Sequence, residues 1–447
     1  MVTTTLSALI LLTLMPVIQC RQKLIVILID GIRYNYETDS LKGFRSIVDS
    51  GVKSDFMRPA FPTTSSTNYY SIATGLNPES HGILGNEVWD EERKEIFKYN
   101  QIDESHDAKS KSYWFNGGEP IWITAEKQGL KSRMYYWIGC DIEIRGKNTT
   151  FCEKYPMKPL TRSQFNYAWT NGIEAIANRS ADFIGIHEDR VYSMGLKHGP
   201  DSIERKNALR DVSEELDSLM KILKYKNLTD VNVMIVSDHG MTKVNNSRVI
   251  RLNTSEENYK LILRNGAVVN LWPKKNKTEE CYKELKDSRI DIFLKRDIPD
   301  RWRYKNNKRV SPLLVVARKG YSIILVGIKK KDTLSKNRGA DSYDNDFEDM
   351  RTYFAATGPA FRKKQILPHF PNVDLYNVMC SILDINPSPN NGTATFDGLV
   401  STNQGHALAN LRSILNRLRI RRYKSIPEYN LETNFDDEDT LFFNDIK

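Results

Sequence analysis

The chain has 447 residues, of which 40% are hydrophobic and 10% aromatic, enough to bury a large core and to exclude an intrinsically disordered protein. Its formal net charge is +9, but the Lys and Arg residues are scattered rather than interleaved with aromatic residues. This pattern argues against a nucleic-acid-binding protein, so we expect no nucleic-acid partner. The length suits one large domain, or one domain with an inserted subdomain.

Residues 1–20 are typical of a secretory signal peptide. Leu9 to Ile18 is a short apolar run, too short to cross a bilayer but of the length of a signal-peptide core. Seven N-x-S/T sequons, the acceptor motif for N-glycosylation, indicate the same compartment: Asn148, Asn178, Asn227, Asn245, Asn253, Asn276 and Asn391. We therefore predict a secreted, extracellular glycoprotein.

The cysteines agree with an oxidising compartment. Cys20 lies at the expected cleavage point, which leaves four cysteines in the mature chain. Cys140 and Cys152 could close a short disulfide-bonded loop. Cys281 and Cys380 either pair or stay buried as thiols.

Two apolar runs each end in side chains that can bind a metal ion. Lys23 to Gly31, KLIVILIDG, predicts a strand buried on both faces of a parallel sheet, with Asp30 at its carboxyl end, where ligands bind in such sheets. Val231 to Gly240, VNVMIVSDHG, repeats the pattern and presents Asp238 and His239. Each Asp alone could be a helix N-cap, but two such ends, one with a His, favour a metal site.

A loop after the first strand predicts a nucleophile. PAFPTTS at 59–65 is followed by an expected helix over 67–74, so Ser65 or Ser66 lies at the helix N-terminus. Exposed backbone N–H groups there favour an anion, and a hydroxyl can attack a phosphoryl group; the alternative is a plain N-cap. Asn86, in the next loop, can donate an amide hydrogen bond to an oxyanion.

Helices and strands then alternate in a pattern that predicts a doubly wound α/β fold. The expected helices cover 39–50, 163–178 and 201–225, and the expected strands cover 52–57, 132–138 and 181–187. Four aromatic residues between 110 and 125 either form a wall of a substrate pocket or pack in the core: Tyr113, Trp114, Phe115 and Trp122.

The elements expected after about residue 245 are less regular. From about 245 to 335 the elements are shorter, with strands at 267–272 and 313–316 around a helix at 277–287, and predict a smaller inserted subdomain. The main sheet returns at 350–361, followed by a helix at 373–384. Residues 401–447 predict a basic amphipathic helix and an acidic tail; that helix contacts an anionic membrane surface or docks on its own protein.

Four ordered motifs resemble those of one enzyme family: DG at 30–31, PTTSSTNYY at 62–70, TGLNPESHGILGN at 74–86 and SDHGM at 237–241. Over about residues 21–400 the chain resembles the ectonucleotide pyrophosphatase/phosphodiesterase family of the alkaline-phosphatase superfamily. FPTTSSTNYY, MYYWIGCDIEI, the Cys140 to Cys152 spacing and NPSPNNG look most like its choline-specific glycerophosphodiesterase branch. The resemblance implies an alkaline-phosphatase-like, mainly parallel sheet with a small inserted subdomain.

The resemblance also implies a two-zinc phosphodiesterase whose hydroxyl nucleophile forms a covalent intermediate that water hydrolyses. Carried over position by position, one zinc site falls on Asp30, Asp238, His239 and the nucleophile Ser65. Asn86 aligns with the oxyanion-binding asparagine. A serine nucleophile in place of the more frequent threonine is a feature of the choline branch.

The second zinc site departs from the family pattern. The family takes it from D-x-x-G-H-x-x-G-P and H-G-Y-D-N segments, which here read YSMGLKHGP and DSYDN. Tyr192, Leu196 and Asp341 therefore replace an Asp and two His, and Leu cannot bind a metal. We expect one bound zinc and a degenerate second site. The candidate substitutes are Asp189 and His198 as ligands and Lys197 as a cation in place of the metal.

Two functions follow from these expectations. The first is a secreted phosphodiesterase that binds a small phosphodiester, a nucleotide or choline-phosphate ester, and whose catalysis is impaired by the missing site. The second is an inactive pseudoenzyme that serves as an extracellular ligand- or protein-binding module.

Overall fold

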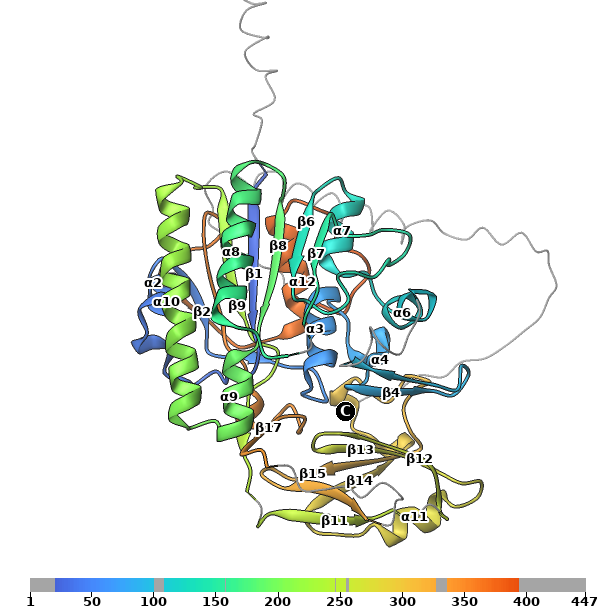
Figure 1. Cartoon of the computed structure of the whole chain (residues 1–447). Coiled ribbons are helices and arrows are strands. Elements are labelled where there is room, and N and C mark those ends of the chain that lie inside the picture. Colours follow the sequence, from blue (N-terminus) through green and yellow to red (C-terminus); the bar gives the residue numbers. More distant parts are fainter. Residues whose placement is uncertain are drawn as a thin grey trace, which may run out of the picture. The chain divides into compact units, whose positions relative to one another are not determined.

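An eight-stranded sheet forms the core of the larger unit, whose described part lies within residues 21–393, in the computed structural model (Figure 1). Its order is β19-β2-β18-β9-β1-β8-β6-β7, and only β18 runs antiparallel to its neighbours. The strands are β1 (Lys23–Ile29), β2 (Gly51–Ser54), β6 (Ser132–Tyr135), β7 (Phe151–Glu153), β8 (Phe183–Glu188), β9 (Val231–Val236), β18 (Phe354–Thr357) and β19 (Gln365–Leu367). This arrangement confirms the predicted mainly parallel sheet.

The structure describes residues 21–99, 108–156, 158–245, 247–254, 257–326 and 336–393. The predicted signal peptide at 1–20 and the predicted basic helix and acidic tail at 401–447 lie outside these residues. Among the described residues, no helix is both long and apolar enough to cross a membrane.

Helices cover both faces of the sheet, as the doubly wound pattern predicts (Figure 1). On one face α2 (Lys42–Asp49), α8 (Arg162–Ala177) and α10 (Ile203–Tyr225) pack with Ile25, Ile27 and Ile29 of β1. On the other face α3 (Ser65–Thr74), α7 (Ile121–Lys127) and α12 (Leu375–Ile382) pack with Leu24, Val26 and Leu28. Both faces of β1 are therefore buried, which explains its unbroken apolar run.

Between β10 (Thr242–Lys243) and β17 (Gly339–Ala340) the chain builds smaller sheets. An antiparallel sheet has the order β12-β13-β15-β14, and β11 pairs with β16 in parallel. These elements and α11 share a hydrophobic cluster of their own. Their bounds are β11 (Val249–Asn253), β12 (Tyr259–Asn265), β13 (Val268–Pro273), α11 (Thr278–Glu284), β14 (Ile290–Leu294), β15 (Leu313–Ala317) and β16 (Ser322–Val326).

The remaining elements are short. The helices are α4 (Pro78–His81), α6 (Ala108–Phe115) and α9 (Arg190–His198), and the strands are β3 (Met57–Arg58), β4 (Glu87–Asp90), β5 (Glu95–Lys98) and β20 (Phe370–Pro371). The 3-10 helices cover Glu37–Ser40, Lys295–Asp297, Asp300–Trp302, Glu348–Met350 and Asn372–Asp374.

Several predicted elements have different bounds in the structure. The helix predicted over 39–50 begins at Lys42, because a 3-10 helix precedes it. The strand predicted over 350–361 covers only Phe354–Thr357, because Gly358 has a φ of +130° and a proline follows it. Trp114, Phe115 and Trp122 are at most 2% exposed, so they pack in the core rather than line an open pocket.

The cysteines and sequons agree with the predicted compartment. Cys140 and Cys152 form a disulfide, while Cys281 and Cys380 are separate buried thiols. The asparagines of all seven sequons are exposed, as N-glycosylation requires.

Candidate functional site

Asp30, Asp238 and His239 meet at the carboxyl edge of the central sheet. β1 and β9 are adjacent and parallel, and Leu28 pairs with Val236, so both aspartates follow their strands at the same level. His239 Nε2 lies 3.1 Å from Asp238 Oδ2 and 3.4 Å from Asp30 Oδ1. Among the described residues these three form the one group of carboxylate or imidazole side chains whose ligand atoms all lie within 4.8 Å.

The helix-cap alternative does not apply to either aspartate. Asp30 is followed by a turn at Gly31, with a φ of +73°, and Asp238 by a loop that leads to β10. The Gly31 N–H donates to Asp238 Oδ1 at 3.1 Å, which turns the Oδ2 atom toward His239.

The charges and orphaned atoms of this cluster fit a divalent cation. Burial, and next the charge of Asp30, raise the pKa of Asp238 to about 7. Burial lowers the pKa of His239, but Asp238, Asp341 and Asp30 outweigh it and raise that pKa to about 9. Asp30 Oδ1 and Asp238 Oδ2 are buried without a hydrogen-bond partner in the described part of the chain. Such atoms on two carboxylates beside an imidazole are suitable zinc ligands.

Ser65 joins this cluster from α3. The N-cap of α3 is Thr64, so Ser65 is the first helical residue rather than the cap, and the helix begins two residues before the predicted start. Ser65 Oγ lies 3.1 Å from His239 Nε2. Asn86 is beside the same helix end, where its Oδ1 accepts from the Ser66 N–H at 3.3 Å.

Two of the residues predicted to stand at the second metal site, Tyr192 and Asp341, lie next to the cluster. The Tyr192 hydroxyl donates to Asp341 Oδ2 at 2.9 Å, and that oxygen lies 3.9 Å from His239 Nε2. The Tyr192 ring is 5.6 Å from the His239 ring and packs so closely on Gly31 that a Cβ there would lie 3.1 Å from Tyr192 Cδ2. The Tyr192 phenol therefore occupies space beside the triad formed by Asp30, Asp238 and His239. Leu196 has no side-chain atom that could bind a metal.

The candidate substitutes have other surroundings. Asp189 Oδ2 accepts from the Tyr155 hydroxyl at 2.6 Å, and its Oδ1 accepts from the Leu160 N–H at 2.8 Å. His198 Nδ1 lies 3.7 Å from Glu204, and Lys197 is exposed in the last turn of α9. None of the three belongs to the described group of close ligand atoms.

Two further residues touch the site and were not predicted. The Tyr69 hydroxyl donates to Asp30 Oδ2 at 2.5 Å and lies 2.6 Å from His187 Nε2. His187 is in β8, opposite Leu28 of β1. The available signals were weak: Tyr69 comes four residues after Ser65, on the same helix face, and His187 interrupts an apolar strand.

The pKa values of Asp30 and His187 reflect this contact. Burial raises the pKa of Asp30, but His187, His239 and Tyr69 together lower it below its usual value. Burial lowers the pKa of His187, while Asp30, Asp189 and Asp238 together raise it above its usual value. The two side chains thus stabilise opposite charges in each other.

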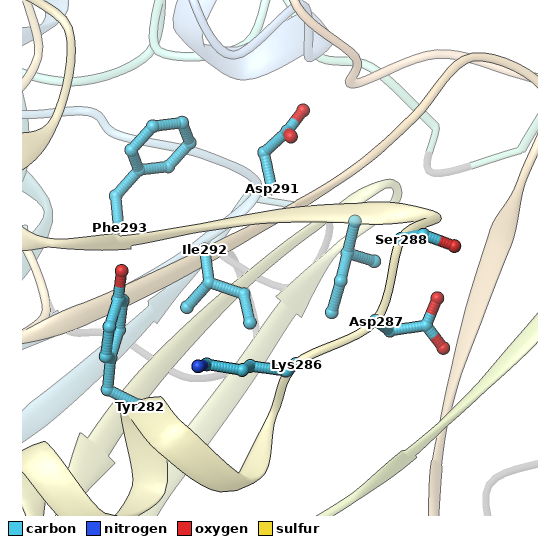
Figure 2. Close-up of a pocket in the computed structure, with 8 residues that line it drawn as sticks. Tyr282, Lys286, Asp287, Ser288, Asp291, Ile292 and Phe293 are labelled. Carbon is cyan, nitrogen blue, oxygen red and sulfur yellow. The ribbon is translucent and has the colours of Figure 1, made fainter.

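A separate hollow of about 460 Å³ is lined by α11, the loop after it and β14 (Figure 2). Ile292 and Lys286 border it from one side of β14, whereas Phe293 and Asp291 point to the other side. Its other lining residues are Tyr282, Asp287, Ser288 and Ile290. It contains none of the predicted site residues.

Comparisons with known proteins find relatives over most of the chain. The chain is 35% identical over 389 residues to bis(5'-adenosyl)-triphosphatase enpp4 of Xenopus laevis, covering 86% of this chain and 82% of that protein. It is 30% identical over 390 residues to ectonucleotide pyrophosphatase/phosphodiesterase family member 7 of Mus musculus, covering 84% and 86%.

Solved structures show the same fold. Murine ectonucleotide pyrophosphatase/phosphodiesterase 5 superposes with a TM-score of 0.75 at 30% identity, covering 85% of this chain and 100% of that one. An inactive variant of that murine protein is described in complex with AMP. The central sheet is thus alkaline-phosphatase-like, while the likeness to the choline-specific branch stays a prediction.

Residues 24–344 match the family described as type I phosphodiesterase / nucleotide pyrophosphatase. That match spans most of the central sheet together with Asp30, Ser65, Asn86, Asp238 and His239. The chain therefore belongs to the ectonucleotide pyrophosphatase/phosphodiesterase family of the alkaline-phosphatase superfamily.

Proposed function

We propose that this protein binds phosphodiesters outside the cell, through Ser65 and one zinc ion held by Asp30, Asp238 and His239, and that it hydrolyses them slowly. The observation that supports this most strongly is the approach of Ser65 Oγ to His239 Nε2, 3.1 Å, beside two buried carboxylates. Secretion is supported by the exposed sequons and the disulfide, and by relatives that are named ectonucleotide enzymes.

Each residue has a part in this proposal. Ser65 Oγ attacks phosphorus and forms a new P–O bond as the leaving alkoxide departs, and water then cleaves the serine phosphoester and restores the hydroxyl. Asn86 accepts the Ser66 N–H on its Oδ1 at the positive end of α3, and its Nδ2 amide hydrogens can be donated to a phosphoryl oxygen. A zinc ion, when bound, supplies positive charge that favours the ionised hydroxyl.

The second metal position explains why hydrolysis should be slow. Tyr192 and Asp341 stand, by the resemblance, for ligands of a second ion; they lie beside His239, and their hydrogen bond supplies no positive charge there. A second metal contributes several kcal/mol to stabilising the transition state, so its loss costs about a thousandfold or more in rate.

The relatives suggest which phosphate esters to test. One relative is named for the hydrolysis of a bis(5'-adenosyl) triphosphate, and another is described with AMP. The choline-branch motifs add choline-phosphate esters. We therefore propose nucleotide and choline-phosphate esters as the two candidate ligand classes.

A second candidate function is binding without turnover. The packing of the Tyr192 ring against Gly31 favours it, because a large side chain fixed there narrows the space beside the triad. Under this proposal the protein is an extracellular ligand- or protein-binding module.

A rescue experiment separates the two candidates. If the second site alone limits the rate, then Tyr192→Asp, Leu196→His and Asp341→His together should give two bound zinc ions and a gain of about a thousandfold in hydrolysis. An aryl phosphodiester, a dinucleotide and a phosphocholine ester serve as substrates. The Ser65→Ala change in the triple variant is the control, and it should remove the gain.

The outcomes favour different functions. Two bound ions with no gain in rate would support the binding module. Wild-type hydrolysis as fast as that of the triple variant would contradict the impaired-enzyme proposal. Single replacements should do little, because one or two ligands hold an ion weakly.

A further inference from the structure

The two oxygens of Asp30 have different surroundings. Oδ2 accepts the Tyr69 hydroxyl at 2.5 Å. Oδ1 is buried, has no hydrogen-bond partner among the described residues and lies 3.4 Å from His239 Nε2. Oδ2 thus accepts a hydrogen bond from the protein, and Oδ1 is left to face the proposed metal position.

Hydrogen-bond geometry fixes the direction of this contact. Tyr69 has one phenolic hydrogen and ionised Asp30 can only accept, so that hydrogen lies toward Asp30. His187 Nε2, 2.6 Å from the phenol oxygen, must then donate to it. His187 Nδ1 lies 3.2 Å from the Tyr136 carbonyl oxygen, which holds the ring from its other side.

Burial protects the arrangement from water. Tyr69 and His187 are each only 3% exposed. Their rings meet edge-on, with centroids 4.9 Å apart. α3 carries Tyr69, β8 carries His187 and the end of β1 carries Asp30, so three elements of the central fold must pack correctly to build it.

We propose that Tyr69 and His187 are positioning residues that reserve Oδ1 of Asp30 for the metal ion. The proposal rests on the metal site of the proposed function. A free carboxylate can rotate and present either oxygen, so a donor on Oδ2 removes the competing orientation before the ion arrives. His187 acts through Tyr69, because it orients the phenol and makes its hydrogen more available to Asp30.

The test is the affinity of the purified full chain for Zn²⁺, measured by competition with a chromophoric chelator. Tyr69→Phe removes only the hydroxyl and should weaken zinc binding by about 10–100-fold, the range seen when such outer partners of metal ligands are lost. His187→Leu should weaken it as well. The double variant should bind no more weakly than Tyr69→Phe alone, since His187 acts through the phenol.

Tyr70→Phe is the matched control on the same helix. The Tyr70 hydroxyl is also buried, but it donates to the backbone carbonyls of Phe115 and Gly118. Its removal should lower the melting temperature and leave the zinc affinity unchanged. A purely structural role for Tyr69 would give the same result as this control.

The outcomes are distinct. Zinc binding by Tyr69→Phe within twofold of wild type would overturn the positioning role and leave the proposed function in place. Absence of zinc binding by the wild-type protein would overturn both, because no metal would then use Oδ1 of Asp30.

Discussion

Two adjacent serines open α3, and their hydroxyls have different surroundings. Ser65 Oγ lies 3.1 Å from His239 Nε2, whereas Ser66 Oγ is buried and has no hydrogen-bond partner in the described part of the chain. Only Ser65 therefore has its hydroxyl beside His239 of the proposed metal site, although the residue pattern alone left both serines open as the nucleophile.

Ser65→Ala should reduce kcat for an aryl phosphodiester to the uncatalysed background, because it removes the attacking oxygen. Ser66→Ala should leave kcat within about twofold, because it deletes a hydroxyl that makes no hydrogen bond in the structure. Steady-state kinetics on both variants check this. Activity retained by Ser65→Ala and lost by Ser66→Ala would reverse the assignment.

The residues of the cluster differ in how well the sequence predicts them. Asp30, Asp238 and His239 each end a buried apolar strand, a local pattern that indicates a shared edge. Tyr69 and His187 lie 118 residues apart and meet only because α3 packs beside β8, which local patterns do not encode. The packing of the Tyr192 ring on Gly31 likewise depends on the placement of α9.

At the scale of elements, α2 and α10 cross at a glycine. A Cβ on Gly43 would lie 2.0 Å from the Ser213 carbonyl oxygen, so the two helices could not keep their distance. In α8, the nearest atom to a Cβ on Gly172 would be in the Ile184 side chain, at 3.0 Å, and that side chain can shift.

Gly43→Ala should therefore lower the free energy of unfolding by about 1–3 kcal/mol, the usual cost of overpacking. Gly172→Ala should change it by less than about 1 kcal/mol, because the higher helix propensity of alanine offsets the closer contact. Urea unfolding of the two variants measures the difference. Equal effects would contradict the described crossing of α2 and α10.

The packing of α4 against α3 should make stability depend on pH. His81 is buried; its Nδ1 accepts from the Ile83 N–H at 3.1 Å, and its Nε2 lies 3.0 Å from Ser71 Oγ. Burial, and next the charge of Arg309, lower the pKa of His81 to about 3. Folded His81 is therefore neutral at pH 5, where an unfolded histidine is charged.

The unfolded state then binds one more proton than the folded state between about pH 6.5 and pH 3, so stability falls as the pH falls through that range. Between pH 7 and pH 5 the loss from His81 should be about 2 kcal/mol, at about 1.4 kcal/mol per pH unit. The His81→Asn variant has no titrating group at this position, so its free energy of unfolding, measured in urea, should fall by about 2 kcal/mol less over the same pH interval. The same slope in both proteins would show that His81 is not responsible.

Helices and strands with long, regular hydrophobic patterns could be predicted from the sequence. The way the strands pair in the sheets could not. The runs 23–29 and 231–236 and the long amphipathic helix near 201–225 are visible in the sequence because burial imposes a regular pattern on them. The antiparallel course of β18 and the pairing of β11 with β16 depend on contacts between distant segments. Those contacts leave no local signal.

At the scale of the whole molecule, the residues of the proposed active site lie together at one edge of the central sheet. Ser65, Asp30, Asp238 and His239 come from three segments far apart in the chain and meet where β1 and β9 end. The chain's family membership agrees with this convergence. The sequence resemblance predicts that Tyr192, Leu196 and Asp341 replace ligands of a second metal ion. The central claim is therefore a site for one metal ion where the family resemblance implies two.

The metal content of the purified protein tests that claim most directly. After incubation with excess zinc and removal of the unbound ion, elemental analysis should give one zinc per chain, and Asp238→Asn should reduce it toward zero, because the substitution removes one of the two carboxylates. Tyr192→Phe should still hold one ion, since the phenol hydroxyl is not a ligand of the proposed site. Two zinc ions per wild-type chain would contradict the degenerate second site, and none would contradict the site at Asp30, Asp238 and His239.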